Sequence, residues 1–246
     1  MEWSEEGIVI GTRRYGETGT ILEAMTREHG RHLGLVRGGR SRRQRPVLQP
    51  GNTLALTWRA RLDEHLGNFR VEPVRERAAG LMETGFASFG LQLLGAHLRL
   101  LPERDPHPRL FDALELVVEN LGEPRLAAEL VARFELLLLD ELGFGLDLAA
   151  CAATGATADL IYVSPKSGRA VSREAGLPFD NRLLRLPAFL ATRGGPDSPR
   201  LGALDDSFAL TGFFLERHVY GPRSMPPPDP RSSFIRAVAA AVGGGL

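Results

Sequence analysis

The hydrophobic period of this sequence changes once, near residue 77, and that change constrains the fold more than any other feature. Between residues 2 and 77, apolar and polar residues alternate, as in strands that bury one face. The clearest example is NTLALTWRARL (52–62), where Leu54, Leu56 and Trp58 share one parity. From about Ala78 the apolar residues recur at helical spacing instead. The sequence therefore predicts a β-rich part followed by a helical part.

The β-rich part contains five strand-like segments. Each is bounded by turn residues such as glycine and asparagine. Five strands within some 75 residues favour a small closed sheet, because closure removes exposed strand edges. We therefore expect residues 1–77 to form a five-stranded β-barrel of the OB-fold type, with strands in 7–16, 18–30, 31–39, 52–62 and 68–76.

The rest of the chain, residues 78–246, is predicted to be a helical domain. Helices are expected within 80–101, 107–122, 124–143, 204–220 and 230–242. The second is expected to bury Leu110, Leu114, Val117, Val118 and Leu121, and the third Leu126, Leu130, Phe134, Leu137 and Leu138. Residues 144–182 lack a clear period and are interpreted as a loop-rich insert. The predicted class is thus a multidomain α+β protein.

Charge is distributed unevenly along a chain whose formal net charge is zero. Residues 27–61 hold nine arginines and one acid, Glu28, so this window carries about +8. Five of the nine lie in one short segment, residues 37–45, which also contains two glycines. A cluster of this kind indicates an electrostatic face rather than a bias of composition.

The arginine-rich segment is the main candidate site. Guanidinium groups pair with phosphate oxygens through a planar fork, and several of them together release counterions from a nucleic acid. The alternative is a solvated surface loop without a ligand. Because nothing here indicates base reading, we expect contact with the nucleic-acid backbone. The candidate residues are Arg37, Arg40, Arg42, Arg43 and Arg45, extended by Arg59 and Arg61. Among the aromatic residues, Trp58 is expected in the core and Tyr15 at the surface.

A degenerate zinc-knuckle pattern lies in the insert. Cys151, Thr154, Ser172 and Ala175 stand where the C-x2-C-x17-C-x2-C pattern of a zinc ribbon has cysteines. One thiolate does not hold structural zinc, so no metal is expected, and Leu160, Ile161, Tyr162 and Val163 are expected to hold the insert by packing. A catalytic role for Cys151, the only cysteine, is the alternative.

No cofactor or catalytic motif is evident elsewhere. The sequence has no phosphate-binding P-loop, dinucleotide fingerprint or H-E-x-x-H motif. We therefore expect a binding protein, not an enzyme, without cofactors. The acidic start MEWSEEG and the absence of a long apolar run predict a soluble cytoplasmic protein that does not enter membranes.

Four stretches of the sequence together resemble the RecO family of bacterial recombination mediators. They are GIVIGTRRYGETGTILEAMTREHGRHLGLVRGGRS, LQPGNTL, FELLLLDELGFGLDLAACAATG and YVSPKSGRAVSREAG. The resemblance covers nearly the whole chain. The missing zinc ligands depart from many relatives, which have four cysteines, and agree with others that lack them.

The resemblance implies a role in DNA repair and homologous recombination. It implies binding of single- and double-stranded DNA, annealing of complementary strands, and action with RecR and, in some bacteria, RecF. It also implies remodelling of single-stranded-DNA-binding protein so that RecA loads on DNA. A helix groove edged by arginine would suit the acidic C-terminal tail of single-stranded-DNA-binding protein, and Arg125 and Arg133 are the candidates for that edge. The alternative function is an RNA- or ribosome-associated OB-fold binding module.

Overall fold

The structure is a computed structural model that describes residues 1–62, 64–191 and 201–243. The chain divides into two compact units, Met1–Gly122 and Glu123–Leu246. Each unit is described by itself below. The boundary between domains after residue 77, expected from the change of period, stays a prediction.

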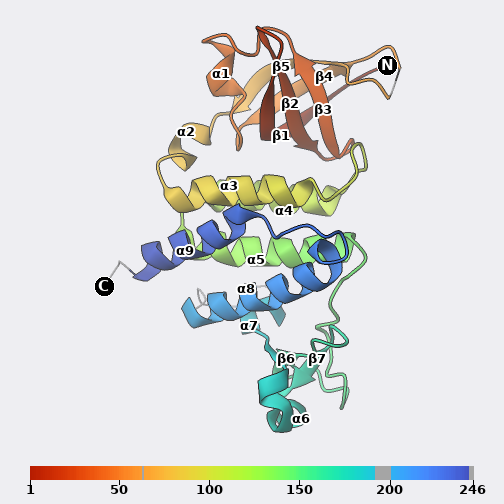
Figure 1. The fold of residues 1–246 in the computed structure, drawn as a ribbon, viewed down its shortest axis with the longest axis vertical. Helices are drawn as coiled ribbons and strands as arrows, with labels where there is room; N and C mark the ends of the chain where they lie inside the picture. The colour runs from red at the N-terminus through yellow and green to blue at the C-terminus, as the bar shows by residue number, and fades with distance from the viewer. Residues whose placement is uncertain (63, 192–200, 244–246) are drawn as a thin grey trace. The chain divides into compact units, whose positions relative to one another are not determined.

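Unit 1 begins with a closed five-stranded barrel (Figure 1). Its strand order, β1-β2-β3-β5-β4, closes back onto β1 and is that of an OB-fold. The five predicted strands and their closure are therefore confirmed. The strands are β1 (Glu2–Tyr15), β2 (Gly19–Thr26), β3 (Arg31–Val36), β4 (Thr53–Arg59) and β5 (Asn68–Arg75).

Alternation along the strands fills the barrel core. Leu54, Leu56 and Trp58 of β4 are buried, as their shared parity predicts. The Trp58 ring is fully enclosed and its Nε1 donates to the carbonyl of Leu66 at 3.0 Å, which satisfies its one polar atom. The barrel is closed by parallel pairing of β3 with β5, through one residue pair, Leu35 and Asn68.

Strand β1 begins five residues earlier than the sequence predicted. Residues Glu2 to Glu6 pair with β4, although three of the five are acidic. The hydroxyls of Ser4 and Thr57 lie 2.9 Å apart across this ladder. Because one face of this extension is exposed, charged side chains are tolerated there, and the apolar signal that marks a strand is weak.

The arginine-rich segment between β3 and β4 is more ordered than a loop. It contains a short helix, α1 (Gln44–Val47), and the buried side chain of Leu48 anchors it to the barrel core. Backbone hydrogen bonds from Gln44 and Arg45 to the Ser41 carbonyl close its first turn. The sequence did not predict this helix, because Pro46 and the run of charges hide its period.

Three helices complete unit 1, and they pack below the barrel (Figure 1). They are α2 (Ala78–Leu81), α3 (Gly85–Leu98) and α4 (Pro108–Asn120). The single helix expected in 80–101 is divided at Thr84, whose backbone is extended. The predicted buried face of α4 is confirmed, since Leu110, Leu114, Val117, Val118 and Leu121 are all enclosed.

Unit 2 is built around α5 (Pro124–Glu141), which packs against α8 (Leu201–Leu215) and α9 (Asp229–Gly243). A π-helical turn, Glu216–Tyr220, continues α8. The predicted buried face of α5 is partly wrong: Leu126 is exposed, whereas Ala127, Ala128 and Glu135 are enclosed. The reason is that small alanines allow the helices to approach closely, and an ion pair, which the hydrophobic period does not reveal, occupies part of the interior.

That ion pair joins three helices of unit 2. The Glu135 carboxylate is fully buried and receives Nε and Nη2 of Arg231 at 2.8 and 3.0 Å. The Thr211 hydroxyl also donates to it at 2.5 Å, and Arg231 Nη2 donates to the carbonyl of Phe208 at 2.8 Å. A buried carboxylate with this many donors is compensated by hydrogen bonds as well as by charge.

The insert of unit 2 contains a small sheet of order β7-β6-β8. Leu160, Tyr162 and Val163 of β6 are buried, and Ile161 is half-buried, so most of the predicted packing residues do hold the insert. The elements are β6 (Leu160–Val163), β7 (Ala170–Ser172), α6 (Arg173–Gly176), a 3₁₀ turn (Leu177–Arg182), β8 (Leu184–Arg185) and α7 (Ala188–Ala191). Within the described part of the chain, no helix is long and apolar enough to cross a bilayer.

Candidate nucleic-acid interface

Three of the nine arginines in the basic window are neutralised by carboxylates from outside it. Arg27 pairs with Asp112 at 2.9 Å, Arg31 with Glu23 at 2.8 Å, and Arg59 with Glu2 at 2.6 Å. The Arg31 pair joins β3 to β2, and the Arg27 pair joins the residue after β2 to α4. The local charge of about +8 that the sequence indicates is therefore an overestimate of what the surface presents.

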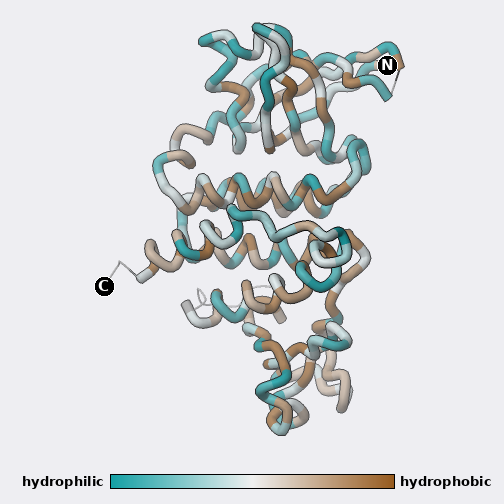
Figure 2. Tube along the Cα trace, in the orientation of Figure 1, coloured by the Kyte–Doolittle hydropathy of each residue, from teal (hydrophilic) through white to brown (hydrophobic). Residues whose placement is uncertain are grey.

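The other six arginines of the window are exposed, and none of them pairs with a carboxylate of the described residues. Arg37 Nε donates to the side-chain oxygen of Asn68 at 3.3 Å, and Arg40 donates to backbone carbonyls. Figure 2 shows the segment that carries α1 as hydrophilic. These six are Arg37, Arg40, Arg42, Arg43, Arg45 and Arg61.

Two hollows lie beside α1, and arginines line both. The larger, of about 640 Å³, is lined by Arg40, Arg42, Arg45, Pro46 and Gln49. The smaller, of about 320 Å³, shares Arg40, Arg45 and Gln49 with it and adds Arg14, Thr20 and Leu48. We call them the large hollow and the small hollow. Because they share two arginines, they form one continuous cationic surface.

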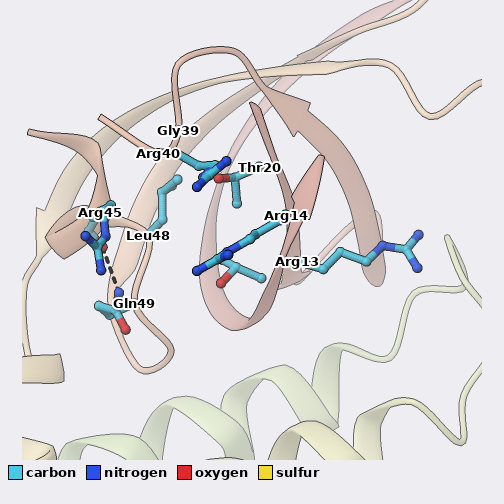
Figure 3. A pocket seen from close by; sticks show the side chains of 9 residues that line it. Arg13, Arg14, Thr20, Gly39, Arg40, Arg45, Leu48 and Gln49 are labelled. Carbon is cyan, nitrogen blue, oxygen red and sulfur yellow. Dashed lines mark hydrogen bonds between the residues drawn. The ribbon is translucent and has the colours of Figure 1, made fainter. Parts of the chain in front are cut away.

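Arg14 is a part of this surface that the sequence reasoning missed. It lies at the end of β1, where its backbone pairs with Thr20 of β2, and its side chain enters the small hollow (Figure 3). Its neighbour Arg13 points away from the other arginines of the hollow, as expected for adjacent residues of a strand (Figure 3). The signal was present as Arg-Arg directly before the hairpin turn, but only the β1–β2 pairing brings it beside residues 37–45.

Arg40 is held in place by the turn between β1 and β2. Its backbone amide donates to the Thr18 carbonyl at 3.1 Å, and its Nη1 donates to the Glu17 carbonyl at 2.5 Å. The preceding residue, Gly39, packs directly on β2, where an added Cβ would lie 2.8 Å from the Thr20 side chain. This close approach fixes the direction of the Arg40 guanidinium before any ligand arrives.

The remaining sequence candidates lie outside the two hollows. Arg37 and Arg59 line a third hollow of about 810 Å³ on the barrel wall, next to Phe69 and Asn68. Arg43 and Arg61 are exposed and line neither the large nor the small hollow. Contact of these four with a ligand stays a prediction, and for Arg59 the ion pair with Glu2 competes with it.

Aromatic residues contribute little exposed area to this surface. Trp58 and Phe69 are buried, whereas Tyr15 is 53% exposed at the end of β1, beside Arg14. Both the core position of Trp58 and the surface position of Tyr15 agree with the sequence analysis. Base stacking therefore has one candidate here, and the phosphate-binding chemistry of arginine dominates the surface.

In unit 2, the two candidate residues for a peptide groove differ in their surroundings. Arg125 is exposed near the start of α5. Arg133 is half-buried, pairs with Glu129 at 2.9 Å and lies over the ring of Phe189 at 5.7 Å. A structural role accounts for Arg133, and a role of either residue at a partner site stays a prediction.

Cys151 lies where the two halves of the knuckle pattern meet. The Ser172 amide donates to its Sγ at 3.3 Å, so the structure brings the first and third positions of the pattern together. Burial opposes ionisation of the thiol, but hydrogen bonds from Ser172, Thr154 and the Ala153 backbone outweigh it, and the pKa falls to about 6. No group of three or more metal-ligating side chains occurs among the residues that the structure describes.

The thiol of Cys151 is expected to titrate near pH 6 in the folded protein. Its pKa is below the usual 9.0, so ionisation stabilises the folded state above that value, and this stabilisation is lost as the pH falls through about 6. The ultraviolet absorbance of the thiolate measures this, with Cys151→Ser as the blank, because the chain has no other cysteine. In urea the midpoint should return toward 9.0; a folded-state midpoint that stays there contradicts the hydrogen-bonded thiolate.

Comparison with known proteins places the chain in a family. The family model described as "Recombination protein O N terminal" matches residues 1–77, and "Recombination protein O C terminal" matches residues 83–226. The chain belongs to the RecO family. The resemblance recognised in the sequence is therefore confirmed.

Curated relatives of this RecO-family chain are similar over almost their full length. A protein of Mesorhizobium japonicum is 61% identical, with 97% of this chain and 94% of the relative covered. A protein of Chelativorans sp. is 62% identical over 97% and 96%, and one of Brucella abortus is 56% identical over 98% of both chains. All three carry the name DNA repair protein RecO.

The zinc site of many RecO proteins does not fit the residues of this chain. The four positions of the pattern hold one thiol, two hydroxyls and the methyl group of Ala175. Structural zinc requires four nitrogen or sulfur ligands, and three of the four are missing here. Instead, the Sγ of Cys151 accepts hydrogen bonds from Ser172 and Thr154, which stand at two of the other three positions. The relation of the insert to a zinc ribbon stays a prediction.

Proposed function

We propose that this RecO-family chain is a DNA repair and recombination protein that binds DNA by its phosphate backbone. The observation that carries this proposal is the cationic surface of the two hollows, whose arginines are exposed and have no carboxylate partner among the described residues. The names of the relatives support the repair role. We call this set, Arg14, Arg40, Arg42 and Arg45, the arginine surface.

The chemistry of the arginine surface suits strand annealing. Guanidinium groups that neutralise phosphates lower the repulsion between two complementary strands, and they leave the base edges free to pair. Nothing on this surface reads a base sequence, so we propose that single- and double-stranded DNA are bound without sequence preference. We also propose that the protein acts by binding alone, without catalysing a covalent step.

The partners follow from the family. We propose that the chain acts with RecR, and with RecF in bacteria that use it. It would remodel DNA coated by single-stranded-DNA-binding protein so that RecA loads. The C-terminal tail of that protein is proposed to bind the helices of unit 2, where Arg125 offers an exposed guanidinium at the start of α5.

Salt dependence tests the binding mode. Affinity for a single-stranded oligonucleotide is measured by fluorescence anisotropy at several salt concentrations. About four phosphate contacts give a log–log slope near −3, because each contact on a single strand contributes roughly −0.7. A slope near zero overturns the proposal. An equimolar RNA competitor separates DNA binding from the RNA- or ribosome-associated alternative, which predicts a preference for RNA.

Annealing tests the function itself. Complementary oligonucleotides coated with single-stranded-DNA-binding protein are mixed with and without the protein, and duplex formation is followed by fluorescence quenching. We expect faster annealing with the protein than without it. The Cys151→Ser variant should anneal as well as the wild type, whereas loss of annealing in that variant would favour the thiol-enzyme alternative.

A further inference from the structure

The small hollow is lined by positive charges from separate parts of the chain. Arg14 comes from the end of β1, Arg40 from the segment after β3, and Arg45 from α1, and their side chains surround Leu48 (Figure 3). All three are exposed, and none of them pairs with a carboxylate in the described parts of the chain. Three chain segments thus converge on a volume of about 320 Å³.

The hollow is held in shape before a ligand binds. Carbonyls of the β1–β2 turn fix one nitrogen of Arg40, so the rest of its planar fork keeps a set direction. The Gln49 side-chain amide donates to the Arg45 carbonyl at 2.8 Å, which ties the residues after α1 back to its first turn. Leu48 is buried and forms an apolar floor. Preorganisation of this kind lowers the entropy lost on binding.

The rest of the lining adds hydrogen-bonding groups. The buried Thr20 side chain carries a hydroxyl at the edge of the hollow, between Arg14 and Gly39 in space. The Gln49 amide nitrogen has a second N–H besides the one given to Arg45. Guanidinium, hydroxyl and amide donors around one small volume suit the several oxygens of a phosphate group.

The number of charges favours a terminal phosphate over an internal one. An internal phosphodiester carries one negative charge, whereas a phosphate monoester carries about −1.5 to −2 at pH 7 and offers three terminal oxygens. Three guanidinium groups that line one small hollow match the monoester better. The large hollow adjoins it, sharing Arg40 and Arg45 and adding Arg42, and so offers guanidinium groups to a neighbouring phosphate of the same strand.

We propose that the small hollow is a binding site for the terminal phosphate monoester of a nucleic-acid strand. This inference rests on the proposed function, since it specifies which part of a strand the arginine surface binds. A 5′-phosphate, a 3′-phosphate and free inorganic phosphate share the recognised chemistry, and the experiment separates them.

The test compares one oligonucleotide in three forms. A single-stranded DNA with an internal fluorophore is prepared with a 5′-phosphate, with a 3′-phosphate, or with hydroxyls at both ends, and its affinity is measured by anisotropy at constant ionic strength. We expect one phosphorylated form to bind about tenfold more tightly than the hydroxyl form, since one more charge-assisted contact forms. Inorganic phosphate, added against a chloride control of equal ionic strength, should reduce this preference.

Two single variants make a matched pair. Arg14 lines only the small hollow and Arg42 only the large one, and both are exposed arginines of the same barrel. In Arg14→Ala the preference for the phosphorylated end should fall to near one, while Arg42→Ala should weaken all three forms by a similar factor and keep the preference. Circular dichroism of both variants checks that they fold.

The outcomes separate the inference from the function on which it rests. If the wild type binds all three forms with equal affinity, the proposed terminal-phosphate site is wrong, while DNA binding itself stands. A preference for the phosphorylated end that persists in Arg14→Ala also contradicts the proposed site. If none of the three forms binds, the proposed function fails as well.

Discussion

Replacing Arg40, Arg42 and Arg45 with alanine is expected to weaken binding of single-stranded DNA about 100-fold at moderate salt. These three line the large hollow, and each exposed guanidinium–phosphate contact contributes about 1 kcal/mol. Three such contacts give about 3 kcal/mol, and 1.4 kcal/mol is tenfold in affinity. The log–log salt slope should also become shallower by about 2, because three contacts are lost. Anisotropy titrations at several salt concentrations measure both effects.

The matched control removes the same charge from elsewhere. Arg169, Arg173 and Arg185 are exposed arginines that pair with Asp147, Asp159 and Asp180. Alanine at these three positions lowers the net charge by the same amount, so an equal loss of affinity in the control would show that overall charge, not the arginine surface, governs binding. The loss in the test variant should be the same for oligonucleotides of different sequence.

Loss of the buried ion pair in unit 2 is expected to have the largest effect on stability. Arg231→Ala leaves the Glu135 carboxylate inside the protein without its bidentate partner, and breaking a buried pair in this way costs about 3 to 5 kcal/mol. Urea unfolding followed by circular dichroism measures the free energy of unfolding. Arg236→Ala is the control, because Arg236 lies on the same helix but is exposed and, among the described residues, donates only to the Ser233 hydroxyl.

A double substitution distinguishes the stranded charge from the lost packing. Glu135→Leu combined with Arg231→Met replaces both charges with apolar groups, so no charge is left buried without a partner. This double variant should be more stable than Arg231→Ala, since apolar replacement of a whole buried pair is often neutral. If Arg231→Ala unfolds at the same urea concentration as Arg236→Ala, the ion pair does not support unit 2.

The barrel was predictable because its signal is local. A strand with one buried face alternates with a period of two, and Leu54, Leu56 and Trp58 show this within five residues. The start of β1 was missed for the same reason: Glu2, Glu5 and Glu6 carry no apolar alternation, and only pairing with β4 makes that segment a strand.

The candidate site was predictable in part. The dense run from Arg37 to Arg45 is visible in the linear sequence, but the charge that it presents depends on partners far along the chain. Glu23 and Asp112 neutralise Arg31 and Arg27, and no local pattern reveals these pairs. Arg14 joins the arginine surface through strand pairing, which likewise requires the fold.

The helical interior shows a third kind of limit. Hydrophobic period located α5, but the enclosed face includes Glu135 because Arg231, 96 residues later, supplies its counter-charge. A rule that assigns charged residues to the surface fails where two of them meet inside.

Three arginines of the basic window, Arg27, Arg31 and Arg59, are paired with carboxylates, and this affects how the molecule meets its ligand. With zero net charge, the protein experiences little attraction to a polyanion at long range, and at physiological salt fields decay over about 8 Å. Diffusion must first bring the arginine surface almost into contact. We therefore expect encounters that present any other face to end without capture, so that association with DNA depends on the orientation of the protein more than on its overall charge.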